Sequence, residues 1–261
     1  MSAPVQQPFD IRLMNATATV LFVGLAVLLV ASLCWWAVRH PLFSLGAITV
    51  QGEVAHNSAA TLRANVAPQL RGNFFTVDLT ATRRAFEAVP WVREATVRRE
   101  FPNRLRVALQ EHHPVALWGE EGGSRMVNSF GELFEANAGD VESEGLPRLA
   151  GPDDQAQQVL AMYRALAPLV EPLDLAVEEL QLTGRGSWRL GLDNGALLEL
   201  GRGDAGEVVP RVQRFVQTLT QVASRYGRRP ESLVSADLRY GDGYALRLRG
   251  VGTVEAAPAR K

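Results

Sequence analysis

The hydrophobic and polar positions along the chain show one long apolar run close to its start. Leu13–Val38 contains 26 residues and no Asp, Glu, Lys or Arg, with Arg12 directly before it and Arg39 directly after it. Crossing about 30 Å of hydrocarbon takes roughly 20 apolar residues in a helix. The run therefore predicts a transmembrane helix over residues 13–38, preceded by a short tail over residues 1–12.

Two other interpretations of this run are a cleaved signal peptide and a lipoprotein signal. The run is longer than the apolar region of a signal peptide, which has about 7–15 residues. Trp35 and Trp36 lie at its end, as in the aromatic belt of a membrane interface. The bulky Leu33 before Cys34 does not fit a lipidation site. An uncleaved anchor is therefore favoured, and Arg12 favours a cytoplasmic tail with the rest of the chain outside.

In the region directly after the anchor, apolar residues recur every two residues where we predict strands and about every 3.6 residues where we predict helices. The predicted order is strand, helix, helix, strand, strand. Asn57 or Ser58 can cap the first helix, Asp78 or Thr80 can cap the second, and Pro90 ends the second. The predicted elements are a strand with Phe43, Leu45, Ile48 and Val50, a helix with Leu62, Val66 and Leu70, a short extended piece at Phe74–Val77, a helix over Thr80–Val89, and strands over Trp91–Glu100 and Leu105–Leu109.

A domain boundary is predicted near residues 111–124, where Glu111–Pro114 ends a strand pattern and Gly119–Gly123 is rich in turn residues. The elements of the second region do not follow a regular strand–helix–strand rhythm, which favours a mixed, mainly antiparallel sheet with two helices. Asn194–Gly195 is a strong hairpin signal. The predicted elements are a hairpin around Ser129–Gly131, helices over Gln155–Val170 and Val208–Tyr226, strands at Leu180–Leu182, Trp188–Leu192 and Leu197–Leu200, and a hairpin or bulged strand over Leu233–Leu248.

These patterns predict an α+β chain with two folded domains outside the membrane. The predicted divisions are a tail at 1–12, the membrane helix at 13–38, a first domain at 41–115, a second at 116–250 and a flexible tail at 251–261. We expect Trp91 and Trp118 to be buried near the sheet of the first domain.

The composition and the isolated reactive residues predict no catalytic, cofactor or metal site. The net charge of −1 gives no long-range attraction to nucleic acid, and the one cysteine, Cys34, lies inside the membrane run. His112 and His113 are neighbours on a strand and point to opposite faces, so they do not form a metal pair. Ser187 lacks the G-x-S-x-G surroundings of a hydrolase nucleophile.

An ordered series of short motifs resembles the FtsQ/DivIB family of bacterial cell division proteins, whose first domain is a POTRA domain. The resemblance covers roughly Phe43–Gly250, with the apolar run in the expected place. The motifs are Pro90–Val92, Val97–Arg99, Phe101–Asn103, Leu105–Glu111, Pro114–Trp118, Met126–Asn128, Leu146–Pro147, Gly151–Pro152, Ser187–Trp188, Leu200–Asp204, Arg214–Phe215 and Val234–Tyr240.

The resemblance implies a single-pass inner-membrane protein at the division septum that scaffolds other division proteins and controls septal peptidoglycan synthesis. It implies that the second domain holds FtsB and FtsL. FtsB would pair with the last sheet edge, and other membrane proteins of the divisome would contact the POTRA domain and the membrane helix. The family's partner-binding positions fall on Tyr240, Asp242, Gly243 and Arg185. Asp242 departs from the small polar residue of the family and could repel an acidic partner.

Two other classes of function stay open at this stage. One is a membrane-anchored cell-wall enzyme, and the other is a transport module, because POTRA domains also serve outer-membrane barrels. The lack of a nucleophile–base pair argues against the enzyme, and the lack of a barrel region argues against the transport module.

Overall fold

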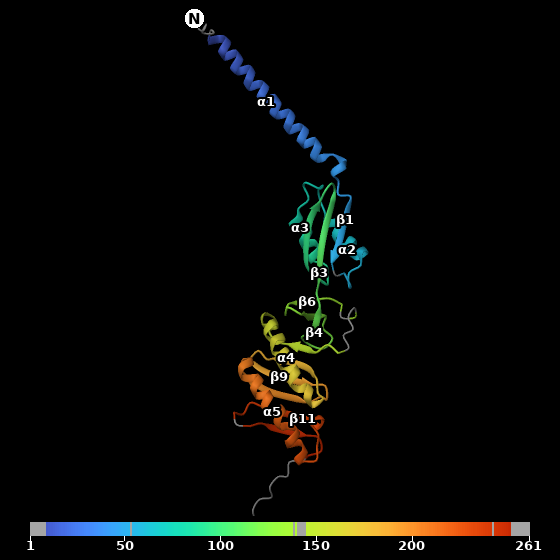
Figure 1. Ribbon diagram of the computed structural model, residues 1–261, viewed down its shortest axis with the longest axis vertical. Coiled ribbons are helices and arrows are strands. Elements are labelled where there is room, and N and C mark those ends of the chain that lie inside the picture. Colours follow the sequence, from blue (N-terminus) through green and yellow to red (C-terminus); the bar gives the residue numbers. More distant parts are fainter. Residues whose placement is uncertain (1–8, 53, 138, 140–144, 242, 252–261) are drawn as a thin grey trace, which may run out of the picture. The chain divides into compact units, whose positions relative to one another are not determined.

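The computed structural model describes residues 9–52, 54–137, 139, 145–241 and 243–251. The chain forms two compact units, Met1–Glu111 and His112–Lys261 (Figure 1). Much of both predicted tails, namely residues 1–8 and 252–261, lies outside the described residues. The α+β class predicted from the sequence is confirmed, because each unit combines helices with a sheet.

The apolar run forms part of one long helix, α1 (Phe9–Arg39). Within it, the 24 residues Leu13–Trp36 are long and apolar enough to cross a membrane once. Large side chains such as Phe22 and Leu28 are exposed instead of packing into a protein core. Both properties agree with the predicted membrane helix.

The fold of the first unit is the predicted β-α-α-β-β arrangement. Within the described residues, a three-stranded sheet has the order β1-β3-β2, with β1 parallel and β2 antiparallel to β3. Both helices begin at the predicted caps: the Ser58 hydroxyl accepts from the Thr61 N–H at 3.1 Å, and the Asp78 carboxylate accepts from the Thr80 N–H at 2.8 Å. The elements are η1 (Pro41–Phe43), β1 (Ala47–Gly52), α2 (Ala59–Val66), η2 (Ala67–Gln69), α3 (Leu79–Glu87), β2 (Val92–Glu100) and β3 (Arg104–Glu111).

Two predicted extended segments of this unit are wrong. Phe43 lies in a single turn of 3₁₀ helix, and the strand starts only at Ala47. Phe74–Thr76 is a turn, because the Asn73 side-chain oxygen accepts hydrogen bonds from the Phe75 and Thr76 N–H groups, both at 3.0 Å. Bonds from an Asn side chain to the following backbone favour a turn over a strand.

The second unit is built on one large mixed sheet. Within the described residues it has nine strands in the order β12-β11-β10-β9-β8-β7-β4-β5-β6. Most neighbours are antiparallel, as predicted; β10–β11, β8–β7 and β7–β4 are parallel. The strands are β4 (Pro114–Trp118), β5 (Arg125–Asn128), β6 (Leu133–Glu135), β7 (Arg148–Ala150), β8 (Val177–Leu182), β9 (Ser187–Leu192), β10 (Leu197–Arg202), β11 (Leu233–Asp237) and β12 (Ala245–Leu248).

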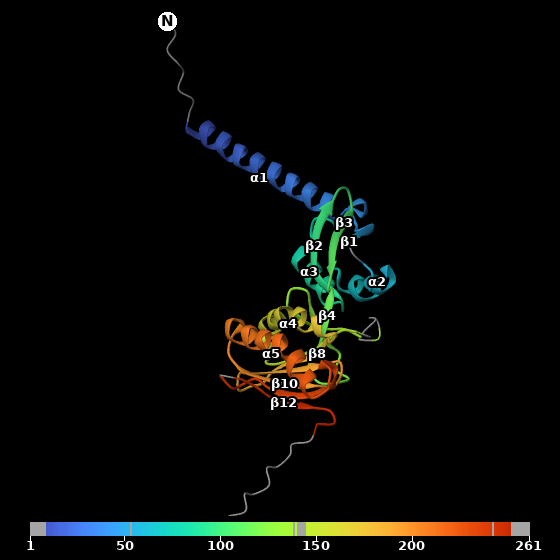
Figure 2. The ribbon, with the colours of Figure 1, turned by 60° about the horizontal axis from the view of Figure 1, so that its bottom comes forward.

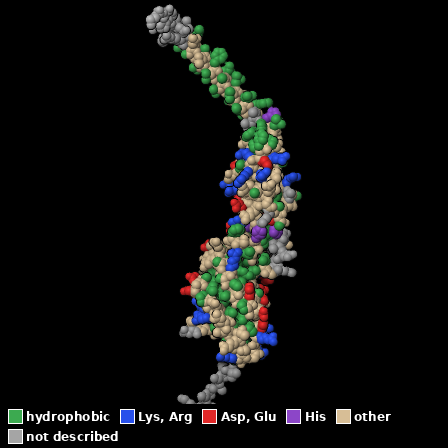
Figure 3. Space-filling model, viewed as in Figure 1, with side chains coloured by type: hydrophobic (Ala, Val, Ile, Leu, Met, Phe, Trp, Pro, Cys, Tyr) green, Lys and Arg blue, Asp and Glu red, His purple; other side chains and the backbone are tan. Residues whose placement is uncertain are grey.

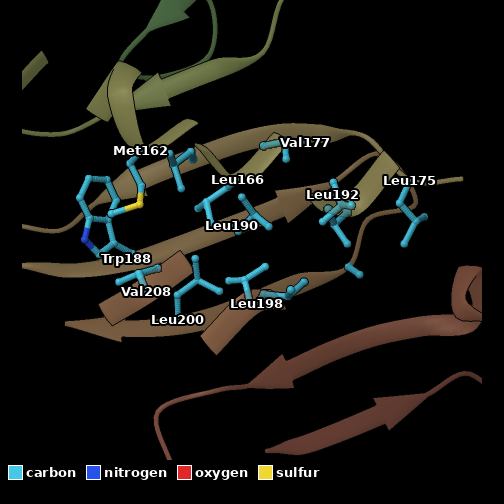
Figure 4. Close-up of a cluster of buried hydrophobic side chains, with 14 of the residues drawn as sticks. Met162, Leu166, Leu175, Val177, Trp188, Leu190, Leu192, Leu198, Leu200 and Val208 are labelled. Atoms are coloured by element: carbon cyan, nitrogen blue, oxygen red, sulfur yellow. The ribbon is translucent and has the colours of Figure 1, made fainter. Parts of the chain in front are cut away.

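Two amphipathic helices, α4 (Ala156–Val170) and α5 (Ala205–Arg225), cover one face of this sheet (Figure 2). Apolar side chains from the helices and from the sheet form the core between these two layers. In this core, Trp188 lies close to Met162 and Val208 (Figure 4). The indole N–H of Trp188 donates to the Gly203 carbonyl at 2.9 Å. A buried Trp needs such a partner, because an unpaired buried donor costs free energy. Short 3₁₀ turns in the described part of the unit include η4 (Asp153–Gln155), η5 (Glu171–Leu173) and η6 (Pro230–Ser232).

Both tryptophans that were expected inside the protein are buried, with exposed fractions of 3% for Trp91 and 2% for Trp118. Trp91 stacks on His56 in the first unit, with ring centroids 4.1 Å apart. Trp118 belongs to the core of the second unit, so its expected place near the first sheet is wrong. The reason is that β4 starts at Pro114 and pairs with β5 and β7.

The last element is a hairpin and not a single bulged strand. β11 and β12 pair antiparallel, with residues 238–244 between them. The hairpin lies at one end of the sheet order, after β10. The sheet therefore ends, within the described residues, at the strand closest to the C-terminus.

Candidate partner-binding site

The outer side of β12 is an edge of the large sheet. Among the described residues, β12 pairs only with β11. An edge strand presents backbone N–H and C=O groups that can pair with a strand from another chain. Ala245 and Arg247 on this strand are exposed, so one face of β12 is uncovered among the described residues.

Tyr240 lies in the loop that leads into this edge and is 59% exposed. The loop is fixed at both ends. Buried Leu238 donates its N–H to the Glu199 carbonyl at 2.8 Å, and the Tyr244 hydroxyl bonds to the Thr218 hydroxyl at 2.8 Å. The ring of Tyr244 also contacts Phe215 edge to face, with centroids 5.0 Å apart. The structure thus presents Tyr240 at the surface, on a supported loop.

A small groove of about 220 Å³ runs between this loop and α5; its lining residues are Arg211, Arg214, Gln217, Thr218, Leu238, Tyr240, Gly243 and Tyr244. A larger depression of about 800 Å³ adjoins it, which we call the arginine groove; it is lined by Thr183, Gly184, Arg185, Ser187, Arg189, Glu199, Gly201, Arg202, Arg211 and Arg239. Arg211 belongs to both linings, so the two depressions are neighbours.

The arginine groove holds five guanidinium groups and one carboxylate. Three of the arginines are engaged within the protein: Arg189 Nε donates to Glu199 at 2.8 Å, Arg211 Nη1 donates to the Leu200 carbonyl at 2.6 Å, and Arg239 donates to Asp237. Arg185 and Arg202 are exposed. Arginine presents several donors in a rigid fork that matches a carboxylate. The groove is therefore suited to an acidic ligand.

Arg239 also pairs with an acidic neighbour, Asp237. Arg239 Nη2 donates to Asp237 Oδ2 at 2.6 Å and Arg239 Nε to Oδ1 at 2.9 Å. The hydrogen bond from Arg239 lowers the pKa of the Asp237 carboxyl and the same bond raises the pKa of Arg239. Both groups therefore stay charged at neutral pH, and the pair fixes the direction of the Arg239 side chain.

The backbone at Gly201 brings the strand and its arginines together. Gly201 has φ +84°, which favours glycine, and it follows an irregularity in the β9–β10 register. A Cβ atom at this position would lie 3.1 Å from Arg239 Cγ and 3.3 Å from Arg211 Nη1. A larger residue here would strain the backbone at this φ and would displace the two arginine side chains by a few tenths of an ångström.

The predicted partner-binding residues occupy neighbouring parts of one surface. Arg185 lies in the arginine groove, on the loop between β8 and β9, and Tyr240 and Gly243 line the small groove. Asp242 lies outside the described residues. Sequence reasoning missed Arg189, Arg202, Arg211, Arg239 and Tyr244. The alternation along β9 and β10 indicates exposed positions for Arg189 and Arg202, but their meeting with Arg211 and Arg239 depends on the sheet order.

Within the described residues, no group of three or more His, Cys, Asp or Glu side chains is arranged to hold a metal ion. His112, one of the adjacent pair in the sequence, stacks on Phe134, with ring centroids 4.2 Å apart. The surface that stands out in this unit is therefore the strand edge with its two grooves.

Comparison with known proteins assigns a family to both units. Residues 43–112 match the family described as "POTRA domain, FtsQ-type", and residues 116–239 match "Cell division protein FtsQ/DivIB, C-terminal". Relatives named cell division protein FtsQ include one from Burkholderia pseudomallei, 41% identical over 93% of this chain and 94% of its own length. Another, from Bordetella pertussis, is 42% identical over 92% of each chain. The relatives carry the name of a division protein and not of an enzyme. This chain belongs to the FtsQ family of cell division proteins.

Proposed function

We propose that the chain is a divisome scaffold whose second unit binds FtsB by strand addition at the outer side of β12, together with FtsL. The observation that carries this proposal is the combination of an open sheet edge with exposed Tyr240 and the arginine groove beside it. Membership of a division protein family supports the role in division.

Strand addition and the two grooves would supply different parts of the binding free energy. Backbone hydrogen bonds along β12 set the register of the added strand, and side-chain pockets provide specificity. Tyr240 offers a rigid aromatic surface of the kind enriched in binding hot spots. Because it is already exposed and its loop is supported, binding requires little rearrangement of this chain.

The arginine groove favours a partner that carries negative charge next to its pairing strand. Arg185 and Arg202 are exposed there, so an acidic stretch next to the pairing strand of FtsB fits the groove. Asp242 follows Tyr240 by two residues in the sequence and carries a negative charge, so we expect the acidic stretch to pair with Arg185 instead.

The membrane helix would keep this surface close to the division site. We propose that α1 is an uncleaved anchor of the inner membrane, with the N-terminus in the cytoplasm and both units in the periplasm at the septum. Arg12 before the apolar run supports this orientation. The POTRA unit and α1 would contact other divisome membrane proteins, so the chain would link early division proteins to control of septal peptidoglycan synthesis.

The test is a titration of a labelled periplasmic FtsB segment against the full chain in lipid nanodiscs. Reversal of charge in Arg185→Glu should weaken binding severalfold, and the loss should shrink as salt rises, because salt screens exposed charges. Arg225→Glu, at an exposed position near the end of α5, is the matched control and should bind normally. Equal affinity of all three proteins at low salt would reject a role for the arginine groove.

A further inference from the structure

The first unit carries a series of neighbouring aromatic rings, Phe43, Phe74, Phe75 and Phe101. Leu42 precedes Phe43 in the chain, and we call these five residues the aromatic tip. The rings form a continuous series: centroids of Phe43 and Phe75 are 4.8 Å apart, those of Phe74 and Phe75 5.2 Å, and those of Phe74 and Phe101 6.3 Å. Three members are exposed, with 70% for Leu42, 47% for Phe75 and 75% for Phe101, whereas Phe74 is buried at 6% and Phe43 is half-buried.

Hydrogen bonds fix the backbone segments that carry these apolar side chains. The Phe74 N–H donates to the Phe43 carbonyl at 2.8 Å, which ties the chain after α1 to the loop before α3. Arg99 donates to the Phe74 carbonyl at 2.7 Å and to the Val77 carbonyl at 2.8 Å. The turn that presents Phe75 is thus fixed by the Arg99 and Asn73 side chains. This fixed turn leaves the Phe75 ring exposed to solvent. An exposed apolar patch can mark a site of contact with a membrane or with another protein.

The covalent chain keeps this tip next to the end of the apolar helix. Phe43 follows Arg39, the last residue of α1, by four residues, which span at most about 14 Å when fully extended. The connection is shorter in fact, because Pro41–Phe43 is a turn of 3₁₀ helix capped by His40. The polar layer of a bilayer is about 5–8 Å thick on each side of the hydrocarbon. If α1 crosses the membrane, the tip lies within reach of this layer.

Positive charge accompanies the apolar cluster. Arg71 precedes the turn at Asn73, and Arg104 follows the Phe101 turn; both are exposed. Figure 3 shows Lys and Arg side chains on the visible face of the first unit, with Asp and Glu side chains among them. Apolar rings flanked by arginines are the composition of surfaces that lie in the headgroup layer, where the rings enter the acyl boundary and the cations meet phosphates.

We infer that the aromatic tip docks into the interfacial layer of the membrane that α1 crosses. The ligand is the lipid surface itself: Leu42, Phe75 and Phe101 enter it, and Arg71 and Arg104 contact lipid phosphates. This contact would limit the movement of the POTRA unit relative to the bilayer. It rests on the membrane span and is independent of partner binding at β12.

Site-specific photo-crosslinking of the full chain in native membranes tests this inference. A benzoylphenylalanine in place of Phe101 or of Phe75 keeps an aromatic side chain and captures whatever lies against it. Illumination should give adducts of phospholipid mass at both positions. Glu94, whose side chain is 62% exposed on β2, is the matched control position and should give severalfold fewer lipid adducts.

A probe at Trp36 checks the span itself, because it should capture lipid whether or not the tip docks. Lipid adducts at Trp36 without adducts above the Glu94 level at Phe75 and Phe101 would overturn the inference. So would adducts of these two positions with a partner protein or a second copy of the chain in place of lipid. In reconstituted vesicles, lipid capture should increase when phosphatidylglycerol replaces part of the phosphatidylcholine, and Arg71→Gln with Arg104→Gln should abolish that increase.

Discussion

Glu111 shows how one buried carboxylate organises the first unit. Its side chain is 2% exposed, and its oxygens accept from the N–H groups of Ala55, His56 and Asn57 at 2.9–3.1 Å. Burial raises the pKa of this carboxyl, but the hydrogen bonds from His56, Asn57 and Ala55 lower it by more, so the pKa of Glu111 lies below its ordinary value. The charged carboxylate therefore stabilises the segment that leads into α2.

We expect Glu111→Gln to destabilise this segment by roughly 1–3 kcal/mol at neutral pH, because N–H groups lose a charged acceptor. A lowered pKa means that the stabilisation is fully present above the pKa of the unfolded chain, about 4.3, and is lost as the pH falls through the folded value. The difference between the two proteins should thus shrink below about pH 4. Amide hydrogen exchange of Ala55–Asn57, followed by mass spectrometry, measures this.

Glu94→Gln is the control, because the Glu94 side chain is exposed and pairs only loosely with Arg93 at 3.9 Å. It should leave exchange of these amides unchanged. A Glu111→Gln protein that exchanges at the wild-type rate at neutral pH would contradict the role given to Glu111.

The same residues show what the sequence could and could not predict at this scale. The caps at Ser58 and Asp78 were predictable because a cap acts on the next turn of its own helix. The partners of Glu111 lie 54–56 residues earlier in the chain, so no local pattern indicates them. Tyr240 and Arg185 were predicted from family resemblance, and the structure places both at the surface.

At the scale of elements, the helices and most strands followed from periodicity. α5 buries Val208, Val212, Phe215 and Leu219, which recur at helical spacing, and Asn194–Gly195 joins β9 to β10. The two misplaced segments both belong to the aromatic tip. There, a 3₁₀ turn at Phe43 and an Asn73 turn override the apolar run that indicated strands. Alternation alone could not reveal these bonds between side chains and backbone.

The edge of β12 gives a prediction for a pair of proline substitutions. Successive N–H groups of a strand point to opposite sides, so one of Leu246 and Arg247 donates toward β11 and the other toward the open edge. Proline removes the N–H. We expect one of Leu246→Pro and Arg247→Pro to lower the melting temperature, and the other to keep the fold but lose FtsB binding.

Thermal unfolding together with FtsB titration separates the two effects. Strand addition would be rejected if the better-folded of the two proline variants bound FtsB as tightly as the wild type. Ala245→Ser on the same strand keeps every N–H and serves as the control that should change neither property.

For the molecule as a whole, the order of the strands in the second unit could not be predicted from the sequence patterns. β7 lies between β4 and β8 and is parallel to both, which requires long crossings of the chain that local periodicity does not encode. The position of the edge follows from this order, and so does the meeting of Arg185 with Arg239 in one groove. The sequence predicted two folded regions after an apolar helix, but not the surface that the second region would present.

The proposed topology gives a further prediction at this scale. A reporter enzyme that is active only outside the cytoplasm should be active when fused after Lys261, and the mature chain should begin at Met1 or Ser2, because the anchor is not cleaved. The same reporter fused before Met1 should be inactive. An N-terminus found near residues 32–45 of the mature chain would contradict the anchor.

We propose that FtsB binds at the β12 edge beside Tyr240, and the Kd of a labelled FtsB segment, titrated against the full chain in nanodiscs, decides this. Tyr240 and Tyr226 are both 59% exposed, so Tyr226→Ala is a matched control for Tyr240→Ala. Loss of a hot-spot side chain costs roughly 2 kcal/mol or more, so Tyr240→Ala should raise the Kd about thirtyfold. Tyr226→Ala should leave the Kd unchanged. An unchanged Kd for a folded Tyr240→Ala protein would contradict the claim.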